Sequence, residues 1–202
     1  IDNTPTHAAM SLPHDGGWPL PPTVPSFSSL DLRGAPSADD AEQIEKDLHR
    51  SGRLELGVTD DEVEAHYASL RRILHAWCHA SNGNYSQAMG RIGMTLVVTA
   101  GPSNPEGAFL SFAWLMRSLP PTYYDNEYRV DARALRLLAA WRWPDVFVPA
   151  MYEPLELVTS QWFLSLWAGV LPMECCVAIW AEIIMAHADD EAVMAETSLR
   201  IA

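Results

Sequence analysis

Apolar residues recur at intervals of three and four from Ser37 onward, which is the spacing that places them on one face of a helix. No stretch alternates apolar and polar residues in the manner of a half-buried strand. Proline and glycine interrupt the pattern repeatedly and divide it into separate segments. The spacing therefore predicts an all-α fold, and 49% hydrophobic residues among 202 supply enough apolar surface for a core.

Capping and breaking residues set the expected helix boundaries. Ser37, with Asp40 three residues later, resembles a capping box, and Gly52 ends that helix just after Arg50. A helix over about 59–80 follows, and others are expected to begin near Tyr85 and at Pro105. Three more are expected over roughly 129–142, 154–169 and 172–187.

Residues 1–38 differ from the helical domain expected over 39–202. Their prolines are scattered among Ser, Thr and Gly, a composition that does not hold regular helix. We expect a flexible leader, or an extended strap whose apolar side chains dock on the domain behind it, namely Trp18, Leu20, Phe27 and Leu30.

The charge balance disfavours several classes of partner. Thirteen basic residues against 26 acidic ones give a formal charge of −13, whereas nucleic acids and anionic membrane surfaces attract proteins through Lys and Arg. The longest uncharged run, Leu157 to Met173, is too short and too polar to span a bilayer. Three cysteines, two of them adjacent, make no disulfide framework, which predicts a reducing, cytoplasmic compartment.

Two cysteine-containing groups could bind metal or react, but a structural interpretation is favoured for both. His75, Cys78 and His79 share one helix face, yet no fourth ligand is nearby and Cys78 falls on the apolar stripe. Cys175 and Cys176 are interpreted as small core residues. Since no phosphate-binding glycine motif is present either, we do not expect the chain to bind a nucleotide on its own.

Two short polar groups attract more attention. Ile44, Asp47 and Arg50 are spaced three apart and lie near one helix face, so Asp47 can hold Arg50 by an ion pair. Tyr85 and Gln87 stand at the start of a helix, after a Gly/Asn break, where the glutamine can project outward. Each group alone also fits an ordinary surface, because an exposed Asp/Arg pair contributes only ~0 to 1 kcal/mol and is common.

In combination, these groups resemble a known family. I-x-x-D-x-x-R at 44–50, followed by Y-x-Q with its glutamine 37 positions after Arg50, resembles the two-finger signature of TBC domains, the GTPase-activating domains for Rab-type GTPases. The segment 105–109 resembles the family's D/E-x-A-F block, and 160–180 resembles its closing W-F to I-W block. The resemblance spans roughly residues 40–187.

The resemblance implies an all-helical, V-shaped domain that docks a Rab-type small GTPase and lends it two side chains. Arg50 would be the arginine finger and Gln87 the glutamine finger. Asp47 would hold Arg50 extended, while Ile44 and Tyr85 would fix the two fingers on their helices. GTP and Mg²⁺ would belong to the partner, so no cofactor of its own is expected, and the partner would bring the protein to endomembranes.

Some positions depart from the family pattern. Ser51 and Arg53 stand where Thr and Pro are usual. Ala88 replaces a glycine beside the glutamine, where an added methyl could narrow the approach of the GTPase. Ala178 and Ala181 replace an Arg and an Asp three residues apart, so both halves of an ion pair are missing together.

These departures leave three hypotheses open. The favoured one is an active Rab-type GTPase activator, because a domain without catalysis has no chemical reason to keep both Arg50 and Gln87. The second is a TBC-like scaffold that binds a small GTPase or another protein without accelerating hydrolysis. The third is a helical adaptor in which both side chains are ordinary surface groups.

Overall fold

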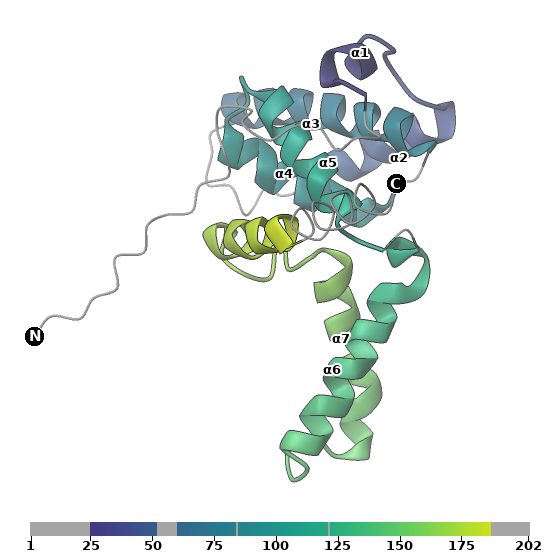
Figure 1. Cartoon of the computed structure of the whole chain (residues 1–202), viewed down its shortest axis with the longest axis vertical. Coiled ribbons are helices and arrows are strands. Elements are labelled where there is room, and N and C mark those ends of the chain that lie inside the picture. The colour runs from purple at the N-terminus through teal and green to yellow at the C-terminus, as the bar shows by residue number, and fades with distance from the viewer. Residues whose placement is uncertain (1–24, 52–59, 84, 121, 187–202) are drawn as a thin grey trace, which may run out of the picture.

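The computed structural model describes residues 25–51, 60–83, 85–120 and 122–186. Within these ranges the regular elements are helices, and the only strand-like pairing is an isolated bridge between Ala168 and Leu171. The all-α prediction is confirmed. Figure 1 shows a helical body with a two-helix arm that projects from it.

The body is built around one long central helix. α3 (Asp60–Ser81) packs against α1 (Phe27–Asp31), α2 (Ala38–Leu48), α4 (Gln87–Ala100) and α5 (Pro105–Arg117). Their inward faces form one apolar core, in which the aromatic rings of Phe109 and Phe112 are fully buried together with Leu70, Ile73 and Ile92. This packing holds the end of α2 and the start of α4 in fixed positions on the body.

The predicted helix starts agree with the observed caps. The Ser37 hydroxyl oxygen accepts a hydrogen bond from the Asp40 backbone N–H at 3.2 Å, and Ser37 donates in turn to the Asp40 carboxylate at 2.8 Å. Asn104 accepts from the Gly107 N–H at 3.0 Å, with Pro105 in the first turn of α5. Both caps fix where the body helices begin.

A short helix within the first 38 residues corrects the sequence analysis. α1 forms between Pro25 and Pro36, where no proline interrupts the chain, and Ser26 precedes it as the N-cap residue. Phe27 and Leu30 of α1 are buried against the core. Trp18 and Leu20, the other apolar residues of the strap interpretation, lie outside the described residues.

The arm consists of two helices that pack mainly on each other. A π-helical turn (Tyr123–Glu127) leads into α6 (Tyr128–Arg142), and a 3₁₀ turn (Pro149–Met151) leads into α7 (Tyr152–Leu164). α6 and α7 bury little: Ala132 and Ala139 on the first helix, Thr159 on the second. Large apolar side chains remain exposed, among them Trp141 at 79% and Leu157 at 70%.

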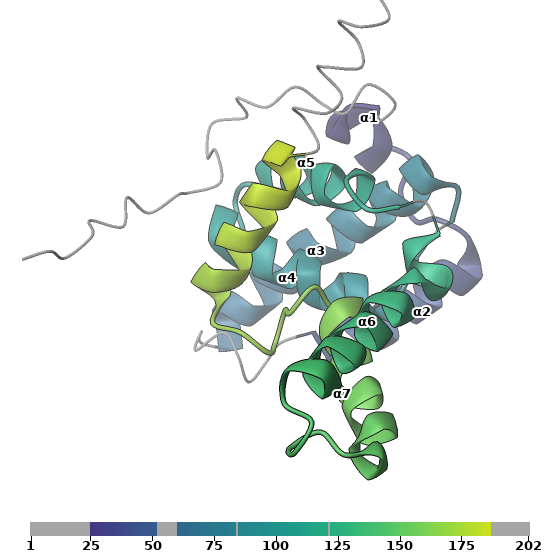
Figure 2. The ribbon, with the colours of Figure 1, turned by 60° about the horizontal axis from the view of Figure 1, so that its bottom comes forward.

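The second arm helix ends earlier than its sequence predicts. α7 stops at Leu164 instead of continuing to residue 169, because Leu166 and Trp167 adopt left-handed backbone conformations with φ of 48° and 64°. Tertiary contacts stabilise this turn: Leu166 is buried, and its carbonyl accepts a hydrogen bond from the Trp180 indole N–H at 3.0 Å. A helix over 173–186 then returns the chain to the body (Figure 1 and Figure 2).

No helix in the described part of the chain is long and apolar enough to cross a membrane.

Candidate functional site

Arg50 lies in the turn that follows α2. The helix ends at Leu48, two residues before Arg50. The Arg50 backbone N–H donates to the Asp47 carbonyl at 3.0 Å. The Arg50 side chain is 66% exposed. Gly52, expected to end this helix, lies outside the described residues. The guanidinium is therefore a solvent-facing group on a turn.

Asp47 is the buried residue beneath this arginine. Its side chain is 1% exposed, and its Oδ1 lies 3.5 Å from Arg50 Nη1. That distance is too long for a strong hydrogen bond, and Oδ1 has no hydrogen-bond partner in the described structure. The predicted ion pair is thus present as an electrostatic tether, and the guanidinium N–H groups donate no hydrogen bond to any other described residue.

The other oxygen of the same carboxylate contacts the segment that precedes α4. Asp47 Oδ2 accepts hydrogen bonds from the Gln43 amide at 2.9 Å and from the Tyr85 hydroxyl at 3.2 Å. Burial and the adjacent Asp47 carboxylate raise the pKa of Tyr85, so the phenol remains a donor at physiological pH. Since Tyr85 is two residues ahead of Gln87, one buried carboxylate connects the Arg50 turn to the start of α4.

Gln87 is the first residue of α4 and is exposed. Ser86 precedes it in an extended conformation as the N-cap, without a side-chain cap bond. Within the described residues, the Gln87 carboxamide makes no hydrogen bond, so both its oxygen and its amide group are available. In this first turn the Met89 backbone N–H donates to the Ser86 carbonyl at 2.9 Å, and the N-terminal end of the helix carries partial positive charge.

Ser51 and Gly90 bring the two segments into close contact. The Ser51 hydroxyl is buried and donates to the Asp47 carbonyl at 2.7 Å. A Cβ placed on Gly90 would lie 2.4 Å from Ser51 Oγ, a distance that real atoms do not adopt. A glycine inside a helix lowers helix stability by about 1 kcal/mol relative to alanine. The close approach of Ser51 explains why a glycine is nevertheless needed at position 90. Sequence reasoning missed this contact, although a glycine inside a helical pattern was the available signal.

The structure also locates Ile44 and the described positions at which the sequence differs from the family pattern. Ile44 is fully buried one turn before Asp47 and anchors α2 on the core. Ala88, next to Gln87, is buried, and the expectation that its methyl narrows the approach of a GTPase stays a prediction. Ala178 is exposed while Ala181 is buried, and Arg53 lies outside the described residues.

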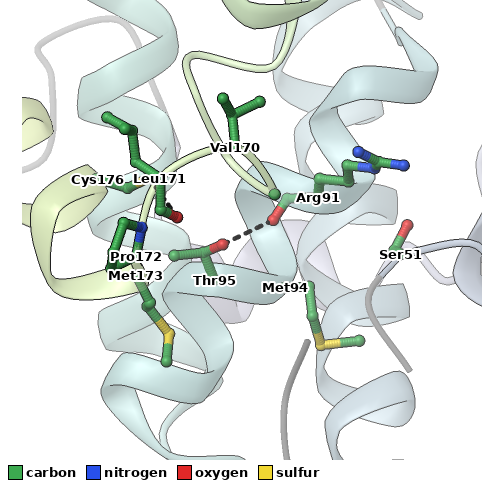
Figure 3. A pocket seen from close by; sticks show the side chains of 10 residues that line it. Ser51, Arg91, Met94, Thr95, Val170, Leu171, Pro172, Met173 and Cys176 are labelled. Carbon is green, nitrogen blue, oxygen red and sulfur yellow. Dashed lines mark hydrogen bonds between the residues drawn. The ribbon is translucent and has the colours of Figure 1, made fainter. Parts of the chain in front are cut away.

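An open cavity of about 400 Å³ borders the same region (Figure 3). Arg91 and Met94 of α4 form one side, residues 169–173 form the other, and Ser51 lies at its edge. In Figure 3 the Arg91 side chain extends from α4 in the direction of Ser51. The cavity is therefore lined by the residue that follows Arg50 in sequence and by residues of the helix that Gln87 begins.

His75, Cys78 and His79, considered above as possible metal ligands, do not form a metal site in the described structure. No group of three or more His, Cys, Asp or Glu side chains with suitable geometry occurs there. Cys78 is buried, and burial together with Asp40 raises its pKa to about 12. Cys176 is also buried, but Cys175 is exposed, which corrects its interpretation as a core residue.

Comparison with known sequences extends these observations. A family model described as the Rab-GTPase-TBC domain matches residues 25–201. TBC1 domain family member 30 from Mus musculus is 28% identical over 161 residues, which cover 70% of this chain and 21% of that protein. Small G protein signaling modulator 3 homolog from Xenopus laevis is 30% identical over 148 residues, covering 69% of this chain and 19% of that protein.

The chain spans about a fifth of the length of these curated relatives. No solved structure matches it. The family match covers the body, both arm helices and the segment that carries Arg50 and Gln87. The chain therefore belongs to the Rab-GTPase-TBC domain family.

Proposed function

We propose that this chain is a GTPase-activating domain that binds a Rab-type small GTPase and supplies Arg50 and Gln87 to its active site. One observation carries the proposal: the buried Asp47 carboxylate contacts the exposed Arg50 guanidinium with one oxygen and Tyr85, two residues before Gln87, with the other. In this proposal, the shared contact with Asp47 keeps the segment of Arg50 and the segment of Gln87 close enough for both side chains to reach the same GTPase.

The arginine meets the electrostatic demand of phosphoryl transfer. Negative charge spreads over the phosphate oxygens in the transition state, and a guanidinium neutralises it with a rigid fork of N–H donors that stays protonated. Asp47 keeps Arg50 oriented at 3.5 Å but leaves those donors unused. An arginine supplied in this way accelerates hydrolysis by about 10³ to 10⁵.

The glutamine meets the second demand, which is to position the attacking water. Its carboxamide oxygen accepts a hydrogen bond from the water and its amide donates elsewhere, so it orients the nucleophile without adding charge. The exposed side chain of Gln87 at the start of a helix, with no hydrogen bond to another described residue, suits this role. GTP and Mg²⁺ are held by the partner, which also directs the protein to endomembranes in this proposal.

The test is phosphate release from a panel of GTP-loaded Rab-type GTPases, each with and without this protein. Acceleration of at least one GTPase by two orders of magnitude or more is the expected result. Unchanged hydrolysis across the panel would contradict the proposal. If a GTPase in its GTP form is then retained in a pull-down, the scaffold hypothesis replaces the activator.

A further inference from the structure

The cavity beside α4 combines an exposed arginine with apolar walls. Arg91 is exposed, and no carboxylate forms an ion pair with it in the described ranges, whereas Arg71 and Arg72 are paired with Glu45 and Asp31. Met94, Val170, Leu171 and Met173 supply the apolar lining. In a chain of net charge −13, an arginine with no carboxylate partner among the described residues, next to such a lining, points to an incoming acidic group.

The position of Arg91 ties this cavity to the proposed fingers. Arg91 follows Gln87 by four residues on α4, and residues at this spacing lie on the same helix face. Ser51, the neighbour of Arg50 in sequence, also lines the cavity, on the side of Arg91. A protein that covers both finger residues therefore also covers the mouth of the cavity.

The far wall is a hydrogen-bonded loop with exposed apolar side chains. Val170 and Leu171 remain 42% and 37% exposed. Their backbone N–H groups donate to the Trp167 carbonyl at 2.9 and 3.1 Å, and the Cys176 thiol donates to the same carbonyl at 3.4 Å. A wall fixed in this way requires little ordering when a partner binds, which favours affinity.

We propose that Arg91 and this cavity determine which GTPase the domain accepts. An acidic side chain of the GTPase pairs with the Arg91 guanidinium, while an apolar side chain next to it enters the cavity between Met94 and Leu171. This inference rests on the proposed function, because it assumes that a GTPase covers the surface of Arg50 and Gln87. Arg91 acts on recognition and does not touch the reacting phosphate.

The experiment compares Arg91→Glu with Arg133→Glu, a matched charge reversal on the exposed surface of α6. KM and kcat for GTP hydrolysis are measured with the GTPase panel at low and high salt. We expect Arg91→Glu to raise KM about tenfold at low salt, less at high salt, with kcat within twofold, and Arg133→Glu to change neither. Leu171→Asp should raise KM in the same way.

A binding measurement separates this inference from the proposed function. Affinity is determined for GTPases loaded with a non-hydrolysable GTP analogue. If the wild-type chain binds but does not accelerate hydrolysis, weaker binding of Arg91→Glu still supports the inference. If the wild-type chain is active and Arg91→Glu keeps KM within twofold for every GTPase, the inference is overturned while the proposed function stands. A loss of kcat without a change in KM also overturns it.

Discussion

The turn after α2 and the start of α4 lie against each other, yet they present their functional side chains in different ways. Arg50 stands on an irregular turn and has a buried counter-charge 3.5 Å away. Gln87 opens a regular helix and has no side-chain partner among the described residues. A flexible charged side chain needs an electrostatic tether, whereas a neutral amide takes its direction from the helix. The arginine side should therefore depend on its surroundings more than the glutamine side does.

The largest effect is expected at the arginine itself. Arg50→Ala should lower kcat by about 10³ to 10⁵, measured by phosphate release under saturating activator. Because the side chain is largely exposed, the free energy of unfolding, measured by thermal denaturation, should change by no more than about 0.5 kcal/mol. Arg50→Lys should remain strongly impaired, since an ammonium lacks the planar fork of donors. Full activity in the lysine variant would show that only the charge matters.

Gln87→Ala comes next. Removing a single group that stabilises or aligns the reacting centre costs about 10² to 10³ in kcat. Gln87→Glu is the matched control, because it keeps the shape but adds negative charge beside the phosphates, and it should not restore the rate. Wild-type kcat in Gln87→Ala would mean that the partner positions its own water.

Asp47→Asn tests the electrostatic contact between Asp47 and Arg50, which has no counterpart at Gln87 among the described residues. The substitution keeps the side-chain shape but removes the charge that faces Arg50, and kcat should fall about tenfold, or 1.4 kcal/mol of barrier. In the Arg50→Ala background the same change should have no further effect on kcat, as a double-mutant cycle would show. Additive losses of kcat in the double variant would show that Asp47 does not act through Arg50.

The smallest effect concerns the spacing between the two segments. Gly90→Ala places a methyl against Ser51 Oγ and should push the Arg50 turn away from α4, lowering kcat a fewfold, an effect of the order of 1 kcal/mol. In Gly90→Ala/Ser51→Ala the clashing oxygen is absent, and the alanine Cβ at position 51 lies 3.5 Å away, so activity should recover to the level of Ser51→Ala alone. No recovery would mean that this contact does not set the spacing.

Local sequence signals predicted much of this region. The Ser37 cap, the i, i+3 pairing of Asp47 with Arg50, and the start of a helix near Gln87 all follow from neighbours in sequence. These features depend on a single helix or turn, so propensity and periodicity suffice to find them. The resemblance to TBC domains assigned Ile44 the role of an anchor, and Ile44 is fully buried.

Contacts between distant segments could not be predicted in this way. The Tyr85–Asp47 hydrogen bond joins residues 38 positions apart, and spacing alone does not say which turn of α2 meets which turn of α4. The early end of α7 has the same origin, since the left-handed Leu166 is stabilised by Trp180 from a later helix. The arm differs from the body in another respect. Its helices carry apolar residues that the described structure leaves exposed, so apolar spacing alone does not show which face of an arm helix is buried.

The most direct test asks whether the two side chains bind the transition state more tightly than the ground state. Affinity is measured for a Rab-type GTPase loaded with a non-hydrolysable GTP analogue, and for the same GTPase with GDP and aluminium fluoride, which imitates the phosphoryl group in transfer. The account predicts that the wild-type chain binds the second form at least about 100-fold more tightly, and that Arg50→Ala/Gln87→Ala loses this preference. Equal affinity of the wild-type chain for both forms would contradict it.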